Sequence, residues 1–180
     1  MRHSYFSKTT VAGVLFAALL VSAGFADPVA SATPKPSSTS SMVVNAAPGF
    51  SGGGEAGRSI QLSSLHGTPV LLVISPSPRN AAFRNQISRL KGIYERLAAQ
   101  GMLCFAAFTS EGGQIPSNIP FILVNNPTSA AAAYDVREGF AVVVIGRDGN
   151  LDCLSTKPLP GQRILDLVLN NAAMQSLIRR

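Results

Sequence analysis

Few of the 180 residues carry a thiol or an imidazole, the side-chain groups best suited to redox chemistry and to binding soft metal ions. The sequence contains two cysteines, Cys104 and Cys153, and two histidines, His3 and His66. His66 lies in a turn segment with no cysteine or acid next to it, so we predict no metal site. The two cysteines remain as candidates for redox chemistry, either as a disulfide or as reactive thiols.

A second candidate for chemistry is the segment from Ser75 to Gln86 (SPSPRNAAFRNQ), which follows the apolar run from Pro69 to Ile74. We interpret it as a turn between a buried strand and a helix, with Asn80 as the N-cap. α/β proteins often place a ligand or a reactive group at such a turn. This turn has no cysteine, histidine or acid. Its free N–H groups, together with Arg79 and Arg84, could bind a small anion.

Hydrophobic patterning predicts the elements that position this turn. Strands are expected at 59–62, 69–74, 102–108, 120–124, 140–145 and 151–154. Apolar residues recur every three or four positions from Phe83 to Leu97, which predicts one helix that ends at Gly101. Further helices are expected at 129–134 and from about Ile164 to Ile178. The fold class is therefore α/β, with a central mixed β-sheet flanked by helices.

The N-terminal residues 1–26 have the features of a secretory signal peptide. Basic residues precede an apolar stretch from Val11 to Phe25, and small residues precede Asp27. Cleavage after Ala32, or retention as an uncleaved anchor, are the alternatives. Residues 27–46 are rich in Pro, Ser and Thr and predict a disordered linker, and residues 47–180 form the domain. We expect an exported protein, periplasmic or extracellular, with no stable membrane span after cleavage.

The charge balance does not favour nucleic acid as a partner. The formal net charge is +6, and removing residues 1–26 lowers it to +4 because that segment contains Arg2 and Lys8 and no acid. No repeat of aromatic and basic residues of the kind that stacks bases is present. We therefore predict that nucleic acid is not a ligand.

Four segments resemble the thioredoxin-like redoxin group, which comprises the alkyl hydroperoxide reductase and thiol-specific antioxidant family and exported thioredoxin-like proteins. These segments are Ala47–Phe50 (APGF), Leu62–Val70 (LSSLHGTPV), Pro120–Leu123 with Ala132–Val136 (PFIL and AAYDV), and Val143–Leu151 (VVIGRDGNL). Together they extend over about residues 47–171. The resemblance implies a thioredoxin-like fold.

The resemblance also implies where a redox centre would lie, and the active-site cysteine motif is missing there. The threonine and peroxidatic cysteine positions of a peroxiredoxin correspond to Asn80 and Phe83, as do the two cysteines of a dithiol motif. Gln86 matches a position where peroxiredoxins often carry Glu or Gln. The cis-proline of thioredoxins, or the activating arginine of peroxiredoxins, falls near Phe140. We expect no catalytic residue here, and we expect Phe83 and Phe140 to approach each other and fill the vacated pocket.

The same fold separates the two cysteines. Its strand order places the strand of Cys104 at one edge of the sheet and the strand of Cys153 on the far side, with two strands between. Three strand spacings amount to about 14 Å, whereas a disulfide requires Cα atoms within about 7 Å. We therefore predict two free, mostly buried thiols.

The function expected from these observations is a non-catalytic binding or scaffold module in the cell envelope, with a protein partner that the sequence does not identify and with no cofactor. One alternative is a peroxiredoxin-like antioxidant or thiol-disulfide oxidoreductase that uses a relocated cysteine, Cys104 or Cys153. Another is a small-anion binder at the helix N-terminus near Asn80, with Arg79 and Arg84 as ligands.

Overall fold

The computed structural model describes residues 45–53 and 58–178 of the chain. The elements in chain order are β1 (Ser51–Gly53), β2 (Ser59–Gln61), the 3-10 helix η2 (Leu62–Ser64), β3 (Val70–Ser75), α1 (Ala81–Lys91), α2 (Tyr94–Ala99), β4 (Leu103–Phe108), β5 (Phe121–Leu123), α3 (Pro127–Ala133), β6 (Ala141–Ile145), β7 (Leu151–Ser155) and α4 (Gly161–Ile178). The predicted signal peptide and residues 27–44 of the predicted linker lie outside the described residues.

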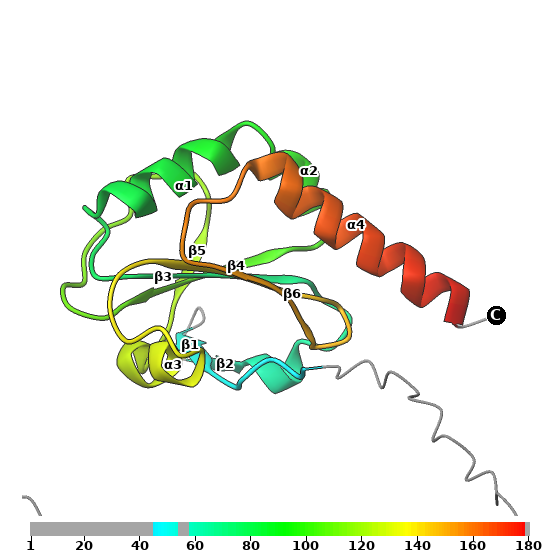
Figure 1. Cartoon of the computed structure of the whole chain (residues 1–180), viewed down its shortest axis with the longest axis horizontal. Coiled ribbons are helices and arrows are strands. Elements are labelled where there is room, and N and C mark those ends of the chain that lie inside the picture. The colour runs from blue at the N-terminus through cyan, green and yellow to red at the C-terminus, as the bar shows by residue number, and fades with distance from the viewer. Residues whose placement is uncertain (1–44, 54–57, 179–180) are drawn as a thin grey trace, which may run out of the picture. The chain divides into compact units, whose positions relative to one another are not determined.

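Five strands form the central sheet in the order β5-β4-β3-β6-β7. β3 pairs in parallel with β4, and β4 with β5, whereas β6 is antiparallel to both β3 and β7. Helices α1, α2 and α4 cover one face of this sheet, and α3 lies on the other face together with β1 and β2 (Figure 1). The predicted mixed sheet flanked by helices is confirmed.

The central strand β3 divides the core into two clusters because its side chains alternate between the two faces of the sheet. Leu71 and Val73 pack among the side chains under α1, α2 and α4. Val70, Leu72 and Ile74 pack toward α3. All five side chains are fully buried, as expected for a continuous apolar run covered on both faces.

The single helix predicted from Phe83 to Leu97 is wrong, since the chain forms two helices, α1 and α2. Ile93 leaves the helical conformation at φ −128° and ψ −1°, directly after Gly92. Glycine is a poor helix former, which favours a break at this point. Both helices still place their apolar side chains toward the same face of the sheet. Gly101 follows α2 with φ +74°, a conformation that suits glycine at a helix end.

The expected edge position of the strand from Met102 to Phe108 is also wrong. β5 pairs with the outer side of β4 and forms the edge of the sheet. The sequence analysis also missed β1, whose residues Ser51–Gly53 have no apolar pattern and pair antiparallel with β2. Asn45 and Ala46, which were assigned to the linker, contact the hairpin between β6 and β7. The N–H of Leu151 donates to the Asn45 carbonyl at 2.9 Å, and Ala46 forms a bridge with Asn150.

Candidate functional site

The turn after β3 is held rigidly by hydrogen bonds to the segment that follows β4. Ser75 is fully buried, and its hydroxyl donates to the Ser77 carbonyl at 3.0 Å. The carbonyl of Pro76 accepts from the N–H groups of Ser110 at 3.1 Å and Glu111 at 2.9 Å. The candidate turn and the loop beginning at Glu111 therefore form one fixed unit at this end of the sheet.

Asn80 is the N-cap of α1, which confirms the interpretation of the sequence. Its Oδ1 accepts hydrogen bonds from the backbone N–H of Ala82 at 2.9 Å and of Phe83 at 3.3 Å. The cap occupies two of the N–H groups that are unpaired at a helix start. An anion at this helix end would have to compete with the Asn80 side chain for them.

Phe83, at the position where the resemblance implies a peroxidatic cysteine, is a core residue with no exposed surface. Its ring contacts Phe108 in a T-shaped arrangement with centroids 5.1 Å apart, and Phe121 at 6.1 Å. Phe140 is buried in the same cluster. The expected filling of this region by phenylalanine is present, but the rings against Phe83 are those of Phe108 and Phe121 rather than that of Phe140.

Gln86 is fully buried in the middle of α1 and is hydrogen bonded through both ends of its amide. Its Oε1 accepts from the N–H of Leu159 at 2.7 Å, and its Nε2 donates to the Leu159 carbonyl at 3.2 Å. One turn further along, the guanidinium of Arg89 donates to the Pro158 carbonyl at 3.3 Å. Gln86 therefore attaches the segment before α4 to α1, and its side chain is not available to a substrate.

The two cysteines are free thiols, as predicted. They lie in one row across the sheet. The register aligns Cys104 of β4 with Leu71 of β3, Leu71 with Val144 of β6, and Val144 with Cys153 of β7. Three strand spacings of about 4.8 Å separate the two residues. Cys104 is buried, and burial raises its pKa to about 12, which keeps the thiol protonated at neutral pH. Cys153 is only half-buried and is thus less enclosed than predicted.

A groove runs along α1 beside the turn, and we call it the α1 groove. It consists of two cavities of about 820 Å³ and 200 Å³ that share Pro78, Arg84 and Pro116. Phe83, Ile87 and Lys91 line the smaller cavity, and Glu111 to Pro116 line the larger one. The groove thus has an apolar side formed by α1, and two prolines, Pro78 and Pro116, line both of its cavities.

The charges at the α1 groove are only partly paired. Arg79 forms an exposed ion pair with Glu111 at 3.4 Å. Within residues 45–53 and 58–178, Arg84 and Lys91 have no side-chain hydrogen bond or ion pair. Arg79 and Arg84 do line one cavity, as the anion hypothesis requires, but the carboxylate of Glu111 lies beside them. The site therefore offers a small excess of positive charge rather than a purely cationic pocket.

The fold is similar to those of several solved structures. A reduced 2-Cys peroxiredoxin from Plasmodium vivax superposes with a TM-score of 0.56 at 18% identity, over 77% of this chain and 99% of that chain. A thiol:disulfide interchange protein DsbE from Chlorobium tepidum superposes with a TM-score of 0.55 at 16% identity, over 71% and 95%. This chain has a thioredoxin-like fold. No protein-family model and no curated protein matches the sequence.

The thioredoxin-like fold confirms what the resemblance implied about architecture. The neighbours include both thiol:disulfide interchange proteins and peroxiredoxins, and the redoxin group was the one predicted. In such a fold the turn after β3 and the start of α1 form the expected redox position, and in this chain they carry Asn80 and Phe83. At sequence identities of 20% or less, these similarities establish the fold of this chain and do not establish its activity.

Three other features considered in the sequence are His66, a cluster of metal ligands and a membrane-spanning helix. His66 is an exposed turn residue near Gly149, and its imidazole Cε1 lies 3.5 Å from the place that a Cβ on that glycine would occupy. In the part of the chain that the structure describes, no three His, Cys, Asp or Glu side chains gather as metal ligands. Among the same residues, no helix has the length and apolar character needed to cross a membrane.

Sequence analysis missed the residues that complete the α1 groove. Glu111 and Arg79, which both line the larger cavity, are 32 positions apart. No local pattern joins such pairs. The available signal was the Gly- and Pro-containing loop from Glu111 to Asn118, which directly follows a predicted strand and therefore starts at the same end of the sheet as the turn.

Proposed function

We propose that this chain is an exported thioredoxin-fold protein that binds a protein partner in the cell envelope and carries out no thiol chemistry. The observation behind this proposal is the complete burial of Phe83 at the redox position. A helix N-terminus can lower the pKa of a thiol and so activate it, but a phenylalanine has no proton to release. Around Phe83, the Asn80 side chain caps α1 and the Phe108 ring packs against the Phe83 ring.

The α1 groove is the surface proposed to contact the partner. Its larger cavity falls within the range of about 300–1,000 Å³ that is typical of ligand sites. Pro78 and Pro116, which line both cavities, limit the freedom of the backbone around the groove, so little ordering entropy would be lost on binding. Ile87 offers apolar contact, and Arg84 and Lys91 offer unpaired charge. An acidic or amphipathic segment of a partner protein has the matching chemistry.

The rival function is that of a thiol enzyme, and the half-buried Cys153 is the observation that favours it. Such an enzyme would need Cys153 to ionise and an external thiol to resolve it, because Cys104 lies three strands away. The high pKa of Cys104, about 12 through burial, makes that residue a poor nucleophile at neutral pH. The anion-binding function receives less support because Asn80 caps the helix and Glu111 pairs with Arg79.

A native thiol titration separates the proposal from the rival. The full chain is titrated with a chromogenic disulfide before and after one equivalent of hydrogen peroxide, alongside Cys104→Ala and Cys153→Ala variants. We expect slow reaction of both thiols and no loss after peroxide, with full reaction of both in urea. Rapid peroxide consumption that disappears in Cys153→Ala would establish a relocated redox centre and overturn the non-catalytic proposal.

The binding half of the proposal is tested by site-specific photo-crosslinking in the native host. A photoreactive residue replaces Ser88, which lines the α1 groove, and a control replaces Ser64, which lies outside it. We expect one discrete cross-linked protein from position 88 only, and its loss when Arg84→Glu is added. Equal cross-linking from both positions, or indifference to Arg84→Glu, would contradict the role assigned to the groove.

A further inference from the structure

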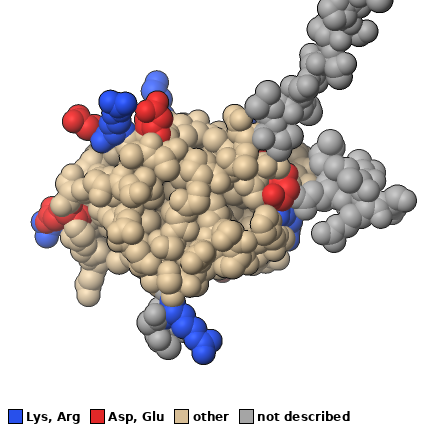
Figure 2. Space-filling model, turned by 90° about the horizontal axis from the view of Figure 1, so that it is seen from below, with Lys and Arg blue, Asp and Glu red and all other residues tan. Residues whose placement is uncertain are grey.

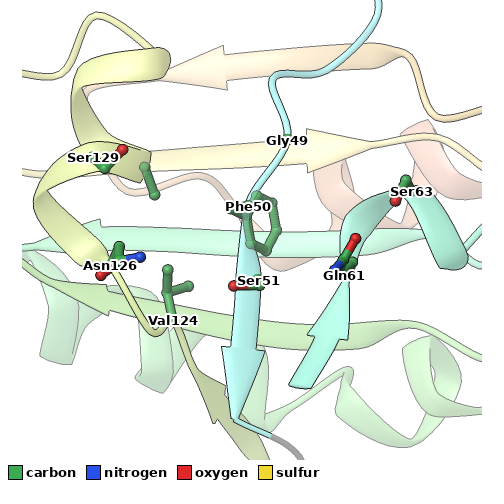
Figure 3. Close-up of a pocket in the computed structure, with 9 residues that line it drawn as sticks. Gly49, Phe50, Ser51, Gln61, Ser63, Val124, Asn126 and Ser129 are labelled. Atoms are coloured by element: carbon green, nitrogen blue, oxygen red, sulfur yellow. The ribbon is translucent and has the colours of Figure 1, made fainter. Parts of the chain in front are cut away.

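A separate pocket of about 330 Å³ lies on the opposite side of the sheet from the α1 groove, and we call it the α3 pocket. Its polar or aromatic lining side chains are those of Phe50, Ser51, Gln61, Ser63, Asn126 and Ser129. Figure 3 shows Gln61 and Ser63 on one side, Asn126 and Ser129 on the other, and Phe50 and Ser51 between them. Three segments that are distant in sequence thus converge on one hollow.

The lining of the α3 pocket contains no charged residue. Figure 2 views the molecule from the side of α3, β1 and β2, and charged side chains lie at the margins of this face while its centre is free of them. A charged ligand here would lose hydration without gaining an opposite charge. The pocket therefore selects for an uncharged ligand.

The polar side chains around the pocket are available to a ligand. Within the described part of the chain, the side chains of Gln61, Ser63, Asn126 and Ser129 have no hydrogen-bond partner. Each amide can both donate and accept, and so can each hydroxyl. A wholly apolar ligand would cover these groups and leave them unpaired, which is unfavourable. The ligand must therefore carry several hydrogen-bonding groups of its own.

An aromatic ring in a fixed position supplies the apolar part of the pocket. Phe50 packs edge-to-face on Phe105, with centroids 5.2 Å apart, and lies 6.5 Å from the ring of Tyr134. The Tyr134 hydroxyl donates to the Pro48 carbonyl at 2.8 Å, which holds the segment that carries Phe50. Val124 and Ala130 complete the apolar surface. Binding would therefore cost little reorganisation of the ring.

These properties together describe a ligand with an apolar face, a ring of hydroxyl groups and no charge. We infer that the α3 pocket binds one pyranose unit of a neutral saccharide. The C–H face of the sugar packs on the Phe50 ring, and its hydroxyls pair with the amides of Gln61 and Asn126 and with the neighbouring serines. This site shares no residue with the α1 groove, so it stands independently of the proposed function.

The test is an NMR titration of the isotope-labelled full chain with the neutral disaccharides maltose, cellobiose and N,N′-diacetylchitobiose. We expect at least one of them to shift the backbone signals of Phe50, Gln61, Asn126 and Ser129 in a saturable way. Gln61→Ala and Asn126→Ala should each weaken that binding about fivefold, since each removes one ligand hydrogen bond. Gln114→Ala removes an exposed amide from the α1 groove instead and should leave the affinity unchanged.

Three results would overturn the inference. The first is that no sugar in the panel shifts these signals. The second is that a sugar binds equally well to the Gln61→Ala/Asn126→Ala double variant, whose native spectrum shows that it is folded. The third is that an uncharged capped tripeptide shifts the same signals with higher affinity than every sugar, which would identify the pocket as a peptide site. None of these results bears on the thiol titration that tests the absence of redox chemistry.

Discussion

Replacing Phe83 tests whether the first turn of α1 contributes to the hydrophobic core. The ring has no exposed surface and contacts two other rings, those of Phe108 and Phe121. Phe83→Ala removes this buried ring and leaves a cavity, which costs about 3–5 kcal/mol in a core. A domain of this size has a free energy of unfolding of about 5–15 kcal/mol. One substitution should therefore remove about a fifth or more of the total stability.

The measurement is equilibrium unfolding of the full chain in urea, followed by far-UV circular dichroism. The midpoint should fall while the slope of the transition stays constant, because the surface exposed on unfolding is nearly unchanged. At about 3 °C per kcal/mol for a domain of this length, the melting temperature should drop by roughly 10–15 °C. Phe83→Leu, which keeps an apolar side chain, should cost only about 1–2 kcal/mol.

Leu123→Ala is the matched control, because Leu123 is an apolar residue on the neighbouring strand β5 with 47% of its surface exposed. It should change the free energy of unfolding by no more than about 0.5 kcal/mol. If Phe83→Ala cost less than about 1 kcal/mol, as little as an exposed residue, the ring would not be a core element. The burial argument for a non-catalytic site would then be refuted.

Three further predictions concern Gln86, Gly161 and Cys104. Gln86→Ala leaves both backbone groups of Leu159 without partners and should lower the free energy of unfolding by about 2–4 kcal/mol in the same urea assay, whereas an unchanged midpoint would mean that water replaces the amide. Gly161→Ala places a Cβ 2.5 Å from the Arg89 carbonyl oxygen and should cost about 1–3 kcal/mol, measured by calorimetry against a Gly112→Ala control that has open space. Burial raises the pKa of Cys104 from 9.0 to about 12, so its contribution to stability is complete below pH 9 and is lost as pH rises toward 12. Cys104→Ala should flatten the fall of the melting temperature over that range, and an identical fall in both proteins would contradict this assignment.

Local chemistry allowed much of the fold to be predicted. The apolar run that became β3 could be identified because both faces of that strand are covered. Asn80 was identifiable as a cap because its side chain satisfies N–H groups of its own helix. The fold class and the redoxin-like architecture followed from the order of such segments. The turn between β3 and α1 was also predictable as a candidate site, since it joins an apolar strand to a capped helix.

Other features depend on contacts that no local pattern encodes. The break at Gly92–Ile93 does not interrupt the apolar stripe, because α1 and α2 present the same face to the sheet. Strand β1 has no apolar pattern because Gly52 lies where a Cβ would be 2.8 Å from Ile122 and Phe105. Only the folded chain reveals that this backbone must come so close. The α1 groove and the α3 pocket are likewise assembled from segments that are far apart in sequence.

The packing around Phe83 also bears on whether a cysteine placed at that position would be reactive. A cysteine introduced at that position would replace a large ring within a closed aromatic cluster and would leave a cavity around the sulfur. It would also start as enclosed as Cys104, whose proton is retained because of burial. A reactive thiol at this position would therefore require Phe108 and Phe121 to change as well. A single exchange of Phe83 for cysteine would supply a sulfur atom without the open surroundings in which a thiol ionises.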